Sequence, residues 1–149
     1  MSECVFCEVV RELQKAETYR RPSGGAYRKI SALPASVVIL GHDQFYRGYS
    51  VVIAKSHATE LYHLPDAERR QYLDDMVRVA RALDQAFRPR KMNYECLGNT
   101  VAHLHWHLFP RYADDPNPMR PIWEHAPAPG ALSDADREAV IGAIRKQLG

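Results

Sequence analysis

Three histidines alternate with apolar residues in the second half of the chain: His103, His105 and His107. Successive side chains of a β-strand point to opposite faces, so this spacing predicts a row of imidazoles on one face of a strand, about 6–7 Å apart. The residues between and after them are expected to anchor the other face in the core: Leu104, Trp106 and Leu108. The pattern favours a rigid group of functional side chains.

A row of imidazoles can support two kinds of chemistry. Alternating histidines can chelate a transition metal, although a catalytic metal site usually needs a further histidine or a carboxylate. No acidic residue lies near this segment in the sequence. Alternatively, a neutral imidazole can attack phosphorus, because one nitrogen is unprotonated near pH 7 and the phosphoramidate it forms is labile. The residues by themselves leave both alternatives open.

A second group of candidate ligands lies at the start of the chain. Cys4 and Cys7 have the C-x-x-C spacing of a metal knuckle, which is also compatible with two small buried residues at the start of a helix. A zinc ion needs four ligands, and Cys2His2 is a usual structural set. Cys96 lies among apolar residues and is predicted to belong to the core.

The elements that position these residues are predicted from periodicity and turn residues. A short helix is expected at 8–15 and an irregular loop or edge hairpin at 19–34. Strands are expected at four places: 36–40, 49–54, 93–97 and 102–110. A loop with five prolines covers 114–129. Strands that pair as hairpins around one long helix predict an α+β fold with an antiparallel sheet.

The long helix is predicted over residues 66–87, where acidic residues complement the positive end of the helix dipole. Apolar residues at three- and four-residue steps predict its buried face: Leu73, Met76, Val77, Ala80, Leu83 and Phe87. Three other residues are expected on a face that meets solvent or a second subunit: Tyr72, Arg78 and Arg81. A last helix is expected from an N-cap at Ser133 to Leu148.

Length and composition exclude several classes of protein. The 149 residues are expected to form a single domain, with a core over 1–125 and a C-terminal loop and helix over 126–149. A net charge of +2 gives no basis for a nucleic-acid partner, and no run approaches the ~20 apolar residues that cross a membrane. Three cysteines and the lack of an apolar leader after Met1 favour the cytoplasm.

These motifs resemble the histidine triad (HIT) superfamily, whose signature is His-φ-His-φ-His-φ-φ with φ apolar. The most specific likeness covers residues 98–111, which read Gly-Asn-Thr-Val-Ala-His-Leu-His-Trp-His-Leu-Phe-Pro-Arg. It extends to residues 47–57, where the family has Gly-x-x-Val-φ-φ-x-Lys-x-His, and to Cys4-Val5-Phe6-Cys7. The segments follow the family's order as far as Trp123.

The resemblance implies a five-stranded antiparallel sheet with one long helix, shorter N- and C-terminal helices, and a two-fold homodimer. It also implies an enzyme that cleaves the α-phosphate linkage of adenosine-type nucleotides through a nucleotidyl-histidine intermediate. The substrates would be dinucleoside polyphosphates, such as diadenosine tetraphosphate, or nucleoside phosphoramidates. His105 is the expected nucleophile, and His107 is expected to hold or donate to the phosphate oxygens.

Four residues are expected to bind substrate: Asn99, Thr100, Asp43 and Gln44. The family usually has Gly-Gln-Ser before the triad, and the amide and hydroxyl of Asn99 and Thr100 can still donate to a phosphate oxygen. Asp43 or Gln44 would contact the ribose, because Gly41 stands where the family has an acidic or amide residue. Trp123 matches a region near the active site or dimer interface. The remaining histidines are expected on the surface: His42, His63 and His125.

Relatives with the same N-terminal cysteine pair complete a zinc site with two histidines. The resemblance therefore implies a structural zinc on four residues: Cys4, Cys7, His57 and His103. The triad would then have two catalytic histidines and one anchor. Three alternatives stay open: a nucleotidyltransferase or phosphorylase that uses the same intermediate, a non-catalytic nucleotide-binding protein, and a metalloenzyme that uses the triad as ligands.

Overall fold

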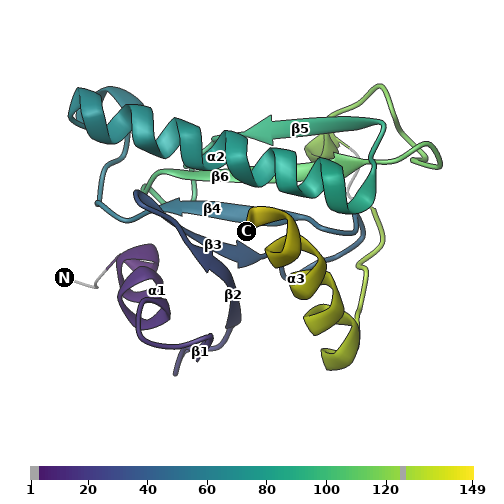
Figure 1. The fold of residues 1–149 in the computed structure, drawn as a ribbon, viewed down its shortest axis with the longest axis horizontal. Coiled ribbons are helices and arrows are strands. Elements are labelled where there is room, and N and C mark those ends of the chain that lie inside the picture. The colour runs from purple at the N-terminus through teal and green to yellow at the C-terminus, as the bar shows by residue number, and fades with distance from the viewer. Residues whose placement is uncertain (1–3, 125–126) are drawn as a thin grey trace.

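Antiparallel pairing joins six strands into one sheet, in the order β1-β2-β3-β4-β6-β5 (Figure 1). A computed structural model of the chain describes residues 4–124 and 127–149. The strands are β1 (Thr18–Arg20), β2 (Ala26–Ala32), β3 (Ser36–Leu40), β4 (Ser50–Ala54), β5 (Lys91–Glu95) and β6 (His105–Arg111). β6 therefore lies between β4 and the edge strand β5, with a neighbour on each side.

Helices cover both faces of the sheet. α2 (Asp66–Phe87) and α3 (Asp134–Leu148) pack on one face, and α1 (Val5–Leu13) packs on the other. Figure 1 shows α2 running along β4 and β6, with α3 beside it. Two short 3-10 helices complete the described structure: η1 (Leu61–His63) and η2 (Ile122–Glu124). No helix of the described residues is both long and apolar enough to span a membrane.

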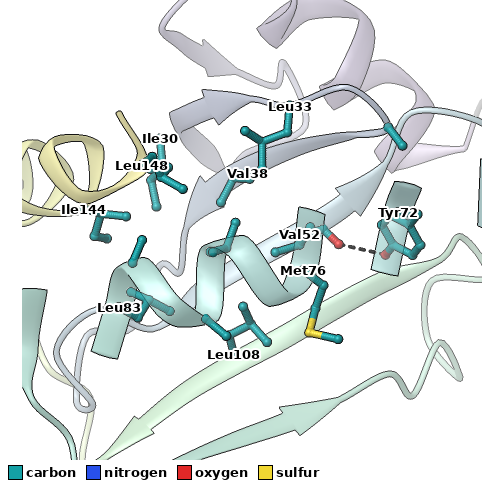
Figure 2. Packing of buried hydrophobic residues seen from close by; sticks show 14 of the residues in the cluster. Ile30, Leu33, Val38, Val52, Tyr72, Met76, Leu83, Leu108, Ile144 and Leu148 are labelled. Carbon is teal, nitrogen blue, oxygen red and sulfur yellow. Dashed lines mark hydrogen bonds between the residues drawn. The ribbon is translucent and has the colours of Figure 1, made fainter. Parts of the chain in front are cut away.

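The core has two layers because β4 and β6 alternate their side chains between the faces. The larger layer, shown in Figure 2, joins the sheet to α2 and α3, and it includes the residues expected behind the histidines: Leu104, Trp106 and Leu108. The smaller layer joins α1 to β3 and β4: Val9, Val10, Leu13, Val37, Ile39, Val51 and Ile53. His105 and His107 pair with Ile53 and Val51, so their side chains lie on the α1 face.

The α+β class, the antiparallel sheet and the three helices are confirmed, with local corrections. The sheet has six strands rather than five, because the segment 19–34 forms the hairpin β1–β2. α1 begins at Val5 rather than Glu8, and β5 spans 91–95 rather than 93–97. Ser133 caps α3 as expected, since its hydroxyl accepts the N–H of Asp136 at 3.1 Å.

The buried face of α2 is rotated relative to the prediction. Tyr72 was expected on the exposed face, but it is completely buried and its hydroxyl donates to the carbonyl of Val52 at 3.0 Å (Figure 2). Val77 was expected in the core, but it is 46% exposed. Arg78 is exposed as expected, and its guanidinium donates to the carbonyl of Leu148. The sheet below α2 selects the buried stripe, and periodicity alone does not locate it.

A buried carboxylate on α2 connects this helix to the start of β3. Asp75 is 1% exposed, and one of its oxygens accepts the N–H of Ala35 and the hydroxyl of Ser36, both at 2.8 Å. Its other oxygen accepts the amide of Gln71 at 3.0 Å. A buried charge is tolerated when such donors replace its hydration.

Asp75→Ala is therefore expected to destabilise the fold by about 3 kcal/mol, because a buried N–H and hydroxyl lose their acceptor. Urea denaturation followed by circular dichroism measures the loss. The neighbouring exposed carboxylate, in Asp74→Ala, is the control and should change stability by less than about 0.5 kcal/mol. Equal effects of the two substitutions would contradict the role given to Asp75.

Candidate active site and metal centre

His105 occupies the first position of β6 and is 6% exposed. Its Nδ1 lies 2.6 Å from the carbonyl oxygen of His103. A carbonyl can only accept, so Nδ1 carries the hydrogen of this bond. In the neutral ring the lone pair is then at Nε2. Nε2 is therefore the ring nitrogen that can act as a nucleophile.

His107 lies two residues farther along β6, and its ring centroid is 4.8 Å from that of His105. Its Nδ1 lies 2.7 Å from the hydroxyl of Tyr49, the residue that precedes β4. Burial lowers the pKa of His107 to about 4, and the neighbouring His105 adds to this effect. The His107 ring is therefore neutral at physiological pH.

Two hollows lie on either side of Trp123, and these two histidines border one of them. One has a volume of about 370 Å³ and is bordered by Asn99, Thr100 and both histidines, so the structure brings these four predicted site residues together. The other, of about 310 Å³, is mainly aromatic and is bordered by Phe45, Tyr46, Tyr49, Phe109 and Trp123. Trp123 borders both hollows and packs edge-on against His107 at 5.8 Å.

The two residues expected at the ribose have different positions. Asp43 borders the aromatic hollow, and its Oδ1 accepts the N–H groups of Phe45 and Gly130. Gln44 is 5% exposed and is not among the residues that border the hollow. Its amide donates to the carbonyls of Gly41 and Tyr49, and its oxygen accepts the N–H of Gly48. The structure thus brings Asp43 to the site and uses Gln44 to hold the turn below it.

Arg111, at the end of β6, holds the loop that leads to Trp123. Its side chain is buried and forms an ion pair with Asp115. The same guanidinium donates to the carbonyl of Asn117 at 2.8 Å and to that of Arg120 at 3.0 Å. A planar group with five donors can serve these partners together. This network fixes a proline-rich loop that has no strand partners.

Four side chains converge near the first turn of α1: Cys4, Cys7, His57 and His103. One ligand atom from each lies within 4.8 Å of all the others. Cys4 is the N-cap of α1 and Cys7 is in its first turn, so the helix presents both thiols on one side. His57 follows β4 and His103 precedes β6. The cluster therefore joins three segments that are distant in the sequence.

The spacing of these donors fits a tetrahedral zinc ion. With Zn–S near 2.3 Å and Zn–N near 2.05 Å, tetrahedral geometry places N and S about 3.6 Å apart and two nitrogens about 3.3 Å apart. Three of the four N–S distances are 3.4–3.6 Å, Nδ1 of His57 lies 3.2 Å from Nδ1 of His103, and no two donor atoms are more than 4.8 Å apart. Two thiols and two imidazoles form a structural zinc set, which has no open position for a substrate.

The structure orients His103 as a metal ligand. Its Nε2 donates to the carbonyl of Ala54 at 2.8 Å, which leaves Nδ1 as the lone-pair nitrogen that faces the thiols. Burial lowers the pKa of His103, so the ring is neutral, as a ligand must be. His103 was expected in a strand with the other two histidines, but it lies in a bend before β6, where its N–H donates to Val101. The metal donor His103 thus lies in a bend, whereas His105 and His107 lie in the strand β6.

Three site residues were missed from the sequence: Tyr49, Phe6 and Glu95. Phe6 lies between the two cysteines and packs edge-on against His105 at 4.8 Å. Glu95 pairs with His107 across β5 and β6 and accepts the indole N–H of Trp123. An acidic residue does therefore lie near the histidines, because the register of β5 against β6 places Glu95 opposite His107. The C-x-x-C spacing could have indicated Phe6, whereas Glu95 has no signal in the sequence.

Of the other histidines, His42 borders the aromatic hollow and is exposed. His63 is exposed beside Thr59, as expected for a surface residue. His125 lies outside the described residues. Cys96 packs against the larger core layer, as predicted.

Comparisons with known proteins identify relatives of this arrangement. Residues 27–114, more than half of the chain, match the family model described as the HIT domain. "Protein hit" of Bacillus subtilis is 29% identical over 115 residues, 73% of this chain and 71% of that protein. A crystal structure of a histidine triad protein from Bradyrhizobium japonicum superposes with a TM-score of 0.73 at 28% identity, over 83% of this chain and 91% of the other. A zinc-bound histidine triad family protein from Mycobacterium smegmatis gives 0.66 at 24% identity, over 98% and 93%.

The metal centre leads to a stability prediction. Purified protein should contain one zinc per chain by elemental analysis, and Cys7→Ser should lose the metal. Because the chain has its own core, we expect a loss of about 3 kcal/mol, or about 10 °C in the midpoint of thermal unfolding, rather than complete unfolding.

Cys96→Ser is the matched control, since it also replaces a thiol but leaves the four donors intact. It should retain stoichiometric zinc. Absence of zinc from protein purified without chelator, or equal zinc content in both variants, would refute the assignment of the site.

Proposed function

This chain belongs to the HIT domain family, and we propose that it cleaves the α-phosphate linkage of adenosine-type nucleotides with His105 as the nucleophile. One observation carries the proposal. The hydrogen bond from Nδ1 of His105 to the His103 carbonyl leaves the Nε2 lone pair beside a hollow that Asn99 and Thr100 also border. A lone pair, polar donors and space for a phosphate are the components of nucleophilic attack on phosphorus.

The reaction would proceed in two displacements. Nε2 of His105 attacks the α-phosphorus, and the bond from phosphorus to the leaving group breaks. The leaving group departs with that electron pair and takes up a proton. Water then breaks the P–N bond, which releases the nucleoside monophosphate and regenerates the free imidazole. The covalent intermediate divides one difficult substitution into two easier steps.

Two sets of residues would hold the substrate. Asn99 and Thr100 can donate from their amide and hydroxyl to the non-bridging oxygens, where negative charge increases during attack. The aromatic hollow suits a flat nucleobase, because Phe45, Tyr46 and Trp123 offer ring faces and edges. Asp43 at its border can accept a hydrogen bond from a ribose hydroxyl. The nucleoside would therefore lie on the Tyr49 side of the histidines.

The zinc centre supports this chemistry without taking part in it. The Mycobacterium smegmatis relative is a zinc-bound protein by its own description, and we extend that property to the Cys2His2 cluster here. The bound ion would be a structural Lewis acid that holds His103 in place. The homodimer and the cytoplasmic location expected from the sequence stay predictions.

His105→Ala should lower turnover of α-labelled adenosine phosphoramidate and of diadenosine tetraphosphate by at least about a thousandfold, because no other group supplies the nucleophile. Product formation is measured by chromatography, with and without inorganic phosphate. Adenosine monophosphate, released beside the amine of the phosphoramidate or beside ATP from diadenosine tetraphosphate, indicates a hydrolase; adenosine diphosphate in its place when phosphate is present indicates a phosphorylase.

His63→Ala is the control, because it removes an exposed imidazole that lies outside both hollows. It should retain wild-type turnover. Turnover that survives His105→Ala would exclude His105 as the nucleophile. Tight nucleotide binding by a wild-type protein that turns over neither substrate would instead favour the non-catalytic alternative.

A further inference from the structure

We propose that Tyr49 is a positioning residue that fixes His107 as a neutral imidazole with its proton on Nε2. This inference rests on the proposed function in one respect, because the N–H at Nε2 of His107 would contact the phosphate of the proposed substrate. Its geometric basis is the 2.7 Å contact between the Tyr49 hydroxyl and Nδ1 of His107. If the hydroxyl donates, Nδ1 is the acceptor, and the one proton of a neutral ring must be on Nε2.

Packing holds the Tyr49 ring in the position that this bond requires. The ring stacks on Phe109, with centroids 4.2 Å apart and planes inclined by 17°. It is also nearly parallel to the ring of His107, at 6.0 Å. These contacts restrict the phenol to a small range of orientations, so the hydroxyl stays on the Nδ1 side of His107. His107 borders the hollow that Asn99 and Thr100 also border, and Nε2 is the ring nitrogen left for a ligand there.

Gly41 makes this placement of Tyr49 possible. A Cβ added at Gly41 would lie 2.1 Å from Cδ1 of Tyr49 and 2.4 Å from Cε1, far inside van der Waals contact. Gly41 and Tyr49 are also joined through the backbone, since the N–H of Gly41 donates to the carbonyl of Tyr49 at 2.8 Å. Any side chain at position 41 must displace the ring. The Tyr49 ring can therefore lie beside His107 only because position 41 has no side chain.

Burial and the neighbouring His105 favour the same protonation state, because both lower the pKa of His107. The titratable groups that face His107 are His105 on its own strand, Tyr49 before β4, and Glu95 on β5, with Asp43 beyond the phenol. Burial raises the pKa of Tyr49, and Glu95 and Asp43 add to this effect, so the phenol keeps its proton and remains a donor. The carboxylate of Glu95 is engaged by the indole of Trp123. The neutral form of His107 is thus favoured by burial and by His105, and the phenol of Tyr49 is available to donate to it.

In the proposed reaction, the two adjacent imidazoles therefore have different roles. The His103 carbonyl directs the lone pair of His105 into the hollow, whereas the Tyr49 hydroxyl directs an N–H of His107 into the same hollow. One ring is thereby prepared to attack and the other to donate. Tautomer control by an outer partner is a known requirement for catalytic histidines.

The test measures the ring directly by ¹⁵N-edited NMR of His107 in protein without substrate. The wild type should show the Nε2–H tautomer at pH 7 and no titration above about pH 5. Tyr49→Phe retains the stacked ring but removes the donor, so it should give a mixture of tautomers and a pKa closer to 6.5. Its kcat should fall by at least about tenfold, with KM changed by less than about threefold.

Two further variants separate the position of the Tyr49 ring from the general loss of a tyrosine hydroxyl. Gly41→Ala retains the hydroxyl but displaces the ring, and should reproduce the tautomer mixture of Tyr49→Phe. Tyr112→Phe removes a hydroxyl that donates to the Arg47 carbonyl outside both hollows, and should leave tautomer and kcat unchanged. A wild-type proton on Nδ1, or a Tyr49→Phe protein with wild-type tautomer or kcat, would overturn the proposal. The NMR result stands independently of turnover, so a failure here is distinguishable from a failure of the proposed function.

Discussion

Three atoms of His103, apart from its backbone N–H, make polar contacts on which the geometry of the candidate active site depends. Its Nδ1 faces the two thiols and His57, its Nε2 donates to Ala54 at the end of β4, and its carbonyl accepts from Nδ1 of His105. The first two contacts fix the ring, and a fixed ring restricts the peptide that carries the carbonyl. Metal binding at one end of the residue would thereby fix the tautomer of His105, the proposed nucleophile, at the other.

This constraint explains why the zinc centre lies beside the active site. β6 is paired on both sides, but the bend that precedes it has one local backbone bond, from His103 to Val101, and two bonds at Leu104, whose N–H donates to Ala58 and whose carbonyl accepts from Ala54. A structural ion there replaces the strand pairing that the bend lacks. It also attaches α1, which brings Phe6 against His105. On the other side of the site, the buried Arg111 performs the equivalent task for the loop of Trp123.

Local sequence patterns were sufficient to predict most helices and strands, but not to predict which residues contact the histidines. Alternation predicted the apolar backing of β6, and helical periodicity predicted α2, because each depends on neighbours in the sequence. The buried position of Tyr72 and the bend at His103 depend on which surface each segment meets. Gln44 shows the same limit, since an amide suited to a ribose is used by three backbone groups of its own turn. Glu95 reaches His107 only through the register of β5.

A covalent bond from His105 to the α-phosphorus is the central step of the proposed reaction. Rapid quenching of the wild-type enzyme with adenosine phosphoramidate, followed by peptide mass spectrometry under alkaline conditions, tests it directly. One adenylyl group is expected on the peptide that contains residues 103–107, attached at His105 and lost on acid treatment. An adduct on a different residue, or turnover with no adduct at any quench time, would contradict it.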